Sequence, residues 1–160
     1  MRILIAYSSL SGNTRDVARM VRARCEAQGH AVTWVDTDIQ TLAKACPEGA
    51  EHDLYLLGSW SDNGGRTPPE MKRFIADLVD AVGKPGHLAV FGTGETQWGM
   101  EYYCGAARRI AAFFGTAHPR LEIEQMPHGA QDALKIERWT DHILSCTETI
   151  AHADPARLIA

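Results

Sequence analysis

Short apolar runs alternate with amphipathic stretches along the whole chain of 160 residues. The apolar runs have the length and composition of buried strands. The stretches between them repeat apolar residues every three to four positions, which is the pattern of helices that bury one face. The predicted strands are Met1–Tyr7, Ala31–Asp36, Asp53–Gly58, His87–Gly92 and Leu121–Met126.

Apolar residues at helical spacing mark a predicted helix after each strand, and glycine or proline ends several of them. The third helix has the clearest start, because Thr67-Pro68-Pro69-Glu70 combines a capping hydroxyl with an early proline and a glutamate. The residues that define the helices are Val17, Met20, Val21 and Cys25 before Gly29; the short segment Asp38–Cys46; Met71, Phe74, Ile75, Leu78, Val79 and Val82; Tyr103, Ala106, Ile110 and Phe114; and Leu134, Ile136, Trp139 and Ile143.

Five strands that alternate with helices predict an α/β fold, with a parallel sheet covered on both faces. We expect one domain over residues 1–146, followed by a polar, alanine-rich tail over 147–160. Ligands of such sheets bind beyond the carboxyl ends of the strands. The loops Ser8–Thr14, Ser59–Arg66 and Thr93–Glu101 are therefore the candidate site.

Composition narrows the function without identifying it. The net charge is −4, from 16 basic and 20 acidic residues, which argues against a nucleic-acid or anionic-membrane partner. No stretch has the roughly 18 apolar residues of a membrane span, and the apolar run at the N-terminus is too short for a signal peptide. The four cysteines form no CxxC pair and the histidines show no ligand spacing, so we expect reduced thiols, a cytoplasmic protein and no metal.

The first loop carries an unusual density of polar groups. Ser9-Leu10-Ser11-Gly12-Asn13-Thr14 lies between a predicted strand and a helix N-terminus, where free backbone N–H groups favour an anion. The loop has no lysine, so it is not a P-loop. Caps use the same residue types, so an ordinary helix cap is the alternative. The nearby Arg15 is interpreted as a group that points to solvent.

Two tryptophans follow predicted strands in the other two loops. Trp60 comes after the third strand and Trp98 after the fourth, where each side chain can stack on a flat ligand. The alternative is that each packs in the core. Trp34 and Trp139 lie within a strand and a helix and are interpreted as packing residues.

Two segments resemble a known family. Ser9–Thr14 resembles the phosphate loop of flavodoxins, S/T-x-T-G-N-T. Gly92–Trp98, followed by Tyr102-Tyr103-Cys104-Gly105-Ala106, resembles their segment G-x-G-D-x-x-Y…Y-F-C-G-A. Glu95 replaces the usual aspartate, Trp98 replaces the ring-covering tyrosine, and two extra residues follow it. The resemblance covers about Met1–Leu144 and lacks the insertion of long-chain members.

The resemblance implies a flavodoxin-like three-layer sandwich of sheet order 2-1-3-4-5 that binds FMN non-covalently. It implies a low-potential one-electron carrier, cycling between semiquinone and hydroquinone, without its own substrate. Asp62, Glu95 and Glu101 would disfavour a second negative charge on the ring. The Asn63–Gly64 peptide would face the flavin N5. The phosphate group would be held by Ser9, Leu10, Ser11, Gly12, Asn13 and Thr14, and the ring by Ser59, Trp60, Ser61, Asn63, Gly64, Thr93, Gly94, Glu95, Trp98, Tyr103 and Cys104.

The resemblance also implies partners. We expect a monomer that takes electrons from a flavodoxin or ferredoxin reductase and passes them to an acceptor enzyme that the sequence does not identify. The alternatives are an activator dedicated to one partner, of the ribonucleotide reductase maturation type, and an NAD(P)H-dependent FMN or quinone reductase. Tyr7-Ser8-Ser9 argues against a phospho-receiver domain, which needs acidic residues there. Cys104 is interpreted as a packed helix-start residue, with a reactive thiol as the alternative.

Overall fold

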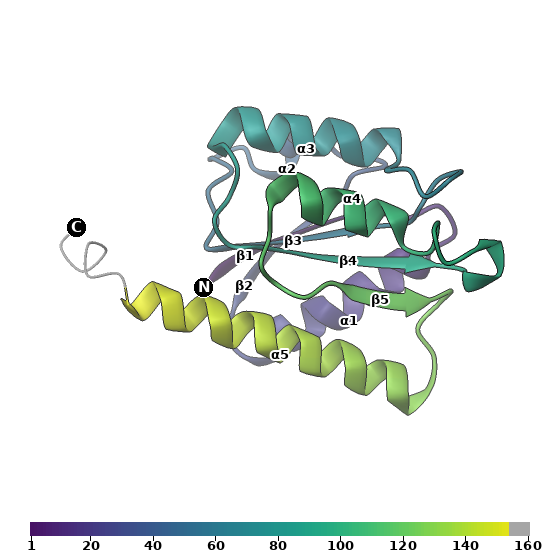
Figure 1. Cartoon of the computed structure of the whole chain (residues 1–160). Helices are drawn as coiled ribbons and strands as arrows, with labels where there is room; N and C mark the ends of the chain where they lie inside the picture. Colours follow the sequence, from purple (N-terminus) through teal and green to yellow (C-terminus); the bar gives the residue numbers. More distant parts are fainter. Residues whose placement is uncertain (154–160) are drawn as a thin grey trace.

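The computed structural model describes residues 1–153 and shows a five-stranded sheet between two layers of helices (Figure 1). All paired strands run parallel, in the order β2-β1-β3-β4-β5. This confirms the predicted fold and strand order. The strands are β1 (Arg2–Ser8), β2 (Ala31–Asp36), β3 (Leu54–Ser59), β4 (Leu88–Gly94) and β5 (Leu121–Glu124).

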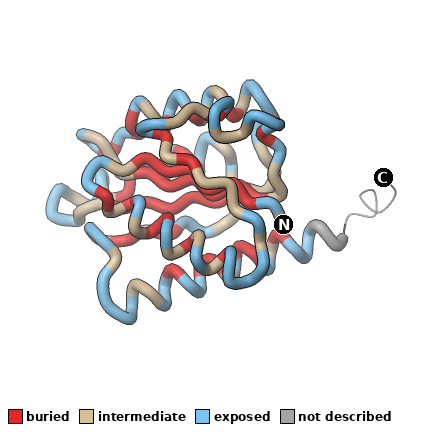
Figure 2. The backbone as a smooth tube through the Cα atoms, turned by 180° about the vertical axis from the view of Figure 1, so that it is seen from behind, coloured by how far each residue is buried: buried red, intermediate tan, exposed pale blue. Residues whose placement is uncertain are grey.

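Helices α1 (Asn13–Ala27) and α5 (Gly129–Ala153) cover one face of the sheet. Helices α2 (Leu42–Ala45), α3 (Pro69–Val82) and α4 (Gly105–Phe114) cover the other. The sheet itself is buried between them (Figure 2). Strand residues therefore divide by alternation, as in Ile3 and Ile5 toward α1 and Leu4 and Ala6 toward α3.

The pair α1 and α5 closes its face of the sheet with apolar and ionic contacts. Val21 and Cys25 of α1 are fully buried in the same cluster as Ile143 of α5. At the edge of this cluster, Arg24 donates two hydrogen bonds to the carboxylate of Asp141, at 2.7 and 2.8 Å. The helix at the C-terminal end is thus an integral part of the core.

Several element boundaries differ from the predicted ones. Helix α3 begins at Pro69 and Thr67 makes no capping hydrogen bond, because the first proline occupies the cap position. Strand β5 ends at Glu124, since Gln125 has a φ of 53°, which breaks the extended backbone. Leu134, expected on the inner face of the last helix, is 44% exposed.

The predicted boundary between domain and tail at Cys146 does not coincide with the end of a helix. Helix α5 continues to Ala153, and Thr147 is buried with its hydroxyl donated to the Ile143 carbonyl. The rest of the predicted tail, 154–160, lies outside the described residues. Over residues 1–153, no helix has the length and apolar character needed to cross a membrane.

Candidate functional site

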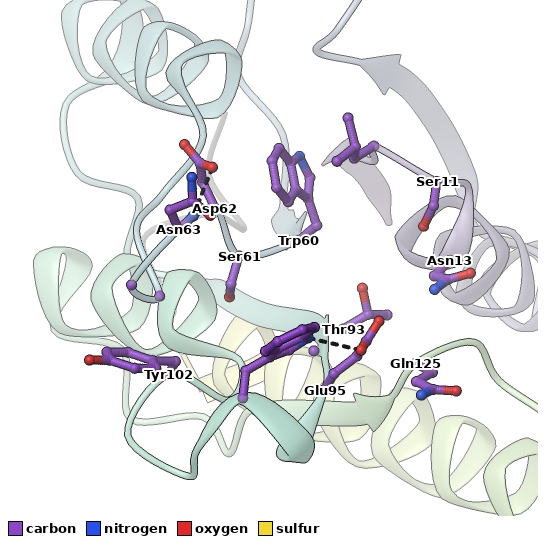
Figure 3. A pocket seen from close by; sticks show the side chains of 15 residues that line it. Ser11, Asn13, Trp60, Ser61, Asp62, Asn63, Thr93, Glu95, Tyr102 and Gln125 are labelled. Atoms are coloured by element: carbon purple, nitrogen blue, oxygen red, sulfur yellow. Dashed lines mark hydrogen bonds between the residues drawn. The ribbon is translucent and has the colours of Figure 1, made fainter.

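A cavity of about 580 Å³ opens at the carboxyl edge of the sheet, beyond β1, β3 and β4 (Figure 3). This volume is within the usual range for small-molecule and cofactor sites. The three loops singled out in the sequence all contribute to it. The lining residues are Leu10, Ser11, Asn13, Trp60, Ser61, Asp62, Asn63, Gly64, Gly65, Thr93, Gly94, Glu95, Trp98, Tyr102 and Gln125.

The loop between β1 and α1 presents backbone N–H groups. Gly12 precedes the helix with a φ of 97°, a conformation that favours glycine. The N–H groups of Gly12 and Arg15 donate to Ser9 Oγ, at 3.1 and 3.2 Å. Within residues 1–153, the N–H groups of Leu10, Ser11, Asn13 and Thr14 have no acceptor, so they are available to an anion.

Only three residues of this loop line the cavity. They are Leu10, Ser11 and Asn13. Ser9 turns its hydroxyl to the loop's own amides, and Gly12 has no side chain to present. Thr14 differs most from expectation, because it is fully buried and its hydroxyl hydrogen-bonds Thr93 Oγ1 at 2.8 Å, which ties α1 to β4.

A carboxylate of the β2–α2 connection holds the start of the first loop by hydrogen bonds. Asp38 accepts hydrogen bonds from the Ser8 hydroxyl at 2.7 Å and from the Ser9 N–H at 2.9 Å. The Ser8 oxygen in turn accepts a hydrogen bond from Trp60 Nε1 at 3.2 Å. One short chain of hydrogen bonds therefore fixes both the start of the loop and the orientation of an aromatic wall. Sequence reasoning missed Asp38, which belongs to no motif.

Both loop tryptophans line the cavity, whereas the other two do not. Trp60 is half-buried and follows β3. Trp98 is 70% exposed and ends a short 3₁₀ turn, Thr96–Trp98; its Nε1 donates to Glu95 Oε2 at 3.0 Å. Trp34 packs on Tyr7 at a ring separation of 4.8 Å, and Trp139 is 7% exposed. The two tryptophans predicted to contact a ligand thus line the cavity, and the two predicted to pack do not.

The β3–α3 loop forms a tight turn at the edge of the cavity. Asp62 and Arg66 pair through two backbone hydrogen bonds, of 2.9 and 3.1 Å, around Asn63, Gly64 and Gly65. Both glycines have a positive φ, of 70° and 72°. The Asn63 carbonyl accepts a hydrogen bond from Arg66 Nε at 2.9 Å. The Asn63–Gly64 region nominated from the sequence therefore lies on the cavity wall, together with Asp62, expected as a charge near the ring, and Gly65, which was not predicted.

The same loop packs directly on the start of α4. A Cβ atom on Gly105 would lie 2.6 Å from the Gly65 carbonyl oxygen, so only glycine allows this approach. Arg109 Nε donates to the same oxygen at 3.1 Å, and Ser61 Oγ accepts the Ala106 N–H at 3.1 Å. The two loops that carry Trp60 and Trp98 are thereby held against one helix end.

Three predicted site residues lie behind the wall rather than on it. Ser59 is buried and donates its hydroxyl to the Trp60 carbonyl at 2.8 Å. Cys104 is fully buried, and burial raises the pKa of its thiol to about 12. A thiol of this kind is inert near neutral pH, which favours the packing interpretation over the reactive one. Tyr103 packs into the cluster beneath α4, where burial raises the pKa of its phenol.

Besides Gly65, two further residues of the cavity wall, Tyr102 and Gln125, were not predicted. Tyr102 lines the cavity in place of the expected Tyr103, which packs into the cluster beneath α4. Gln125 directly follows β5, and its N–H donates to the Gly94 carbonyl at 2.7 Å. Its place at the carboxyl edge was a usable signal, but only the loops after the first, third and fourth predicted strands had been considered.

The arrangement suits a flat aromatic ligand that carries a phosphate. Two indoles from separate loops offer stacking surfaces, and free amides at a helix N-terminus lie at the end of the cavity near Ser11 and Asn13 (Figure 3). Asp62 and Glu95 add negative charge along the walls. The residues present therefore fit a flavin mononucleotide.

Comparison with known proteins agrees with this geometry. The flavodoxin-domain family model matches residues 4–141. The chain is 27% identical over 139 residues to the probable flavodoxin 2 of Bacillus subtilis, covering 82% of this chain and 87% of that protein. It is 30% identical over 108 residues to the flavodoxin of Nitratidesulfovibrio vulgaris, covering 68% and 71%.

A solved structure is similar over nearly the whole length of both chains. The crystal structure of oxidised flavodoxin 2 from Bacillus cereus superposes with a TM-score of 0.73 at 28% identity, covering 91% of this chain and 99% of that one. The chain belongs to the flavodoxin family, in its short-chain form. Its cofactor is FMN and its function is FMN-based electron transfer, which confirms both predictions.

Proposed function

We propose that this flavodoxin binds its FMN in the cavity between Trp60 and Trp98 and acts as a one-electron carrier without a substrate of its own. The observation that carries the proposal is that these two indoles, from loops after β3 and β4, line one cavity with the amide-rich loop of Ser9–Thr14. The two remaining tryptophans, Trp34 and Trp139, pack within the protein and do not line this cavity.

The phosphate would be held by the first loop. The N–H groups of Leu10, Ser11, Asn13 and Thr14 would donate to its oxygens, with the side chains of Ser11 and Asn13 beside them. Ser9 and Thr14 contribute by shaping the loop, since their hydroxyls already have protein partners. The ring would lie against Trp60 and Trp98, with Asn63, Gly64, Glu95 and Gln125 at its edges.

The bound flavin supplies the redox chemistry, and the chain's own residues set its electrostatic environment. Asp62 and Glu95 place carboxylates on the cavity wall. Like charges in a partly desolvated site repel, so these residues oppose the accumulation of negative charge on the ring and keep the second electron at low potential. Glu101 is exposed and lies outside the cavity lining, so it contributes less than expected from the sequence.

Access to the ring edge is the other requirement of a carrier. Trp98 and Tyr102 line the cavity and are 70% and 44% exposed, so they lie at its mouth, where a partner protein can approach. A reductase as donor, an acceptor enzyme, a monomeric state and a cytoplasmic location stay predictions. The four free cysteines support the reducing compartment.

An anaerobic reductive titration of the FMN-loaded protein tests the proposal. We expect the absorbance spectrum after one electron per flavin to differ from any mixture of the fully oxidised and fully reduced spectra. A single two-electron step would contradict the one-electron role. Sustained oxidation of NADPH by the purified protein would contradict the absence of its own substrate. Failure to bind FMN at all would overturn the assignment of the cavity.

A further inference from the structure

We propose that the guanidinium of Arg15 binds the phosphate of FMN and makes the first loop select FMN over riboflavin. The inference rests on the proposed function, since it concerns the same cavity, but it names a residue whose type and position the loop motif does not require. Sequence analysis had interpreted Arg15 as a group that points to solvent. In the structure the Arg15 side chain is exposed and lies outside the residues that line the cavity, but its guanidinium lies close to the backbone of the first loop.

Arg15 folds back over the loop instead of extending away from the helix. A Cβ atom on Gly12 would lie 3.0 Å from Arg15 Nη2 and 3.8 Å from its Cζ. Side chains near the start of a helix lean toward its N-terminus, which favours this direction. The backbone of Arg15 is fixed as well, because its N–H donates to Ser9 Oγ at 3.2 Å. The guanidinium therefore lies beside Gly12, in the same loop as the amides that are available to an anion.

Arg15 differs from the other arginines of α1, which all pair with carboxylates. Its neighbours along α1 are paired: Arg19 with Asp16 at 3.4 Å and Arg22 with Glu26 at 2.8 Å. Among residues 1–153, no carboxylate lies within ion-pair distance of the Arg15 guanidinium, which is exposed. Asp38, which supports the same loop, already accepts hydrogen bonds from Ser8 and Ser9. The positive charge of Arg15 is therefore available to a ligand.

The electrostatics of the site make such a cation effective. The chain carries a net charge of −4, and Asp62 and Glu95 add carboxylates to the cavity wall. A phosphate monoester carries about −1.5 to −2 charges at neutral pH, whereas a helix N-terminus offers only about half a positive charge. A guanidinium adds a full charge and can donate two parallel hydrogen bonds to phosphate oxygens. Riboflavin, which lacks the phosphate, gains nothing from it.

Flavin binding by the full-length apo-protein tests this inference, with Arg15→Gln compared against Arg19→Gln. Arg19 is the matched control, because it is an exposed arginine of the same helix that pairs with Asp16 and does not approach Gly12. Dissociation constants for FMN and for riboflavin would be measured by quenching of flavin fluorescence. The ionic strengths would be about 0.01 M and about 0.15 M, between which the Debye length falls from about 30 to about 8 Å.

At low ionic strength we expect Arg15→Gln to weaken FMN binding about tenfold, a loss typical of one charged hydrogen bond. Riboflavin binding should stay unchanged, and Arg19→Gln should match the unmodified protein for both flavins. The selectivity of the unmodified protein should fall as salt is raised, and that of Arg15→Gln should fall much less. Arg15→Lys should recover part of the FMN affinity, since lysine restores the charge but cannot donate two parallel hydrogen bonds as a guanidinium does.

Equal FMN affinity for Arg15→Gln and the unmodified protein would overturn the inference while leaving the proposed function intact. An equal loss for FMN and riboflavin would also overturn it, because that result would indicate a structural effect on the loop. If the unmodified protein bound neither flavin, the proposed site itself would be wrong, and the inference would fall with it. Circular dichroism of each variant would show whether the fold is retained.

Discussion

The indole nitrogen of Trp60 donates a hydrogen bond to Ser8 Oγ at 3.2 Å, across two neighbouring strands of the sheet. The Ser8 hydroxyl donates a hydrogen bond to Asp38 Oδ1 at 2.7 Å, so the serine both accepts and donates. Ser8 is fully buried and Trp60 half-buried. The orientation of one wall of the flavin cavity is therefore set by a residue that does not line the cavity.

Replacing Ser8 with alanine should loosen Trp60 and weaken FMN binding. A buried hydrogen bond contributes about 1 kcal/mol net, so we expect roughly a fivefold rise in the dissociation constant of FMN. Tryptophan fluorescence should also shift, because the indole N–H loses its partner. Fluorescence titration measures both, and Ser145→Ala on the exposed surface of α5 is the control. Unchanged affinity and emission would show that Trp60 is held by packing alone.

Trp98 and Trp139 should separate ligand binding from stability. Trp98 is 70% exposed, so Trp98→Ala should leave the thermal midpoint of the apo-protein almost unchanged while costing about 1–3 kcal/mol of FMN binding. Trp139 is buried, stacks edge-on against Phe91 and donates to the Pro119 carbonyl. Trp139→Ala should lower the free energy of unfolding by about 3–5 kcal/mol. Calorimetry and flavin titration would check both, and a large stability loss in Trp98→Ala would contradict its assignment.

Gly105→Ala should disturb the cavity through the backbone. The added methyl group would lie 2.6 Å from the Gly65 carbonyl oxygen, so the turn of residues 62–66 must move. We expect a destabilisation of about 1–3 kcal/mol and weaker FMN binding. Gly86→Ala is the matched control, because a Cβ atom there meets nothing within 4 Å, and its effect should stay within about 0.5 kcal/mol. Equal effects of the two substitutions in chemical denaturation would contradict the close contact.

The cysteines should differ sharply in reactivity with pH. Burial raises the pKa of Cys25 and of Cys104 to about 12, and a raised pKa means that the thiol stays protonated as pH rises toward that value. At about pH 8 their reactive thiolate fraction is lower by roughly a thousandfold than in an exposed cysteine. Iodoacetamide should therefore modify the half-buried Cys146 in the native protein, and Cys25 and Cys104 only after denaturation. Peptide mapping by mass spectrometry measures this, and rapid native labelling of Cys104 would restore the reactive-thiol hypothesis.

The strands were predictable to within two residues at each end. Apolar runs buried on both faces mark the three central strands, whereas β2 and β5 at the sheet edges are only partly buried. The positions of Trp60 and Trp98 followed from the same reasoning, since a residue just after a parallel strand must lie at the carboxyl edge. The strand order came from the family resemblance and not from periodicity. A hydrophobic pattern identifies a strand without indicating its neighbours.

The finer placement of site residues depends on packing that the sequence does not show. Tyr102 and Tyr103 are adjacent and chemically identical, yet Tyr102 lines the cavity and Tyr103 packs beneath α4. Thr14 belongs to the phosphate-loop pattern, yet its hydroxyl hydrogen-bonds that of Thr93 in β4, a contact between residues far apart in the chain. Contacts of this kind exist only in the assembled fold.

Helix α5 closes the face of the sheet that α1 begins, and Arg24 reaches across to Asp141. A ribosome that adds about 5–20 residues per second will have made the whole first half of the protein before this cover exists. Until Ile136 and Ile143 emerge, the apolar residues of α1 and of the sheet that pack on α5 stay uncovered. A nascent chain that stalls before the last helix is thus a client for chaperones, and truncation within α5 should lower the yield of soluble protein well before it removes any residue of the flavin site.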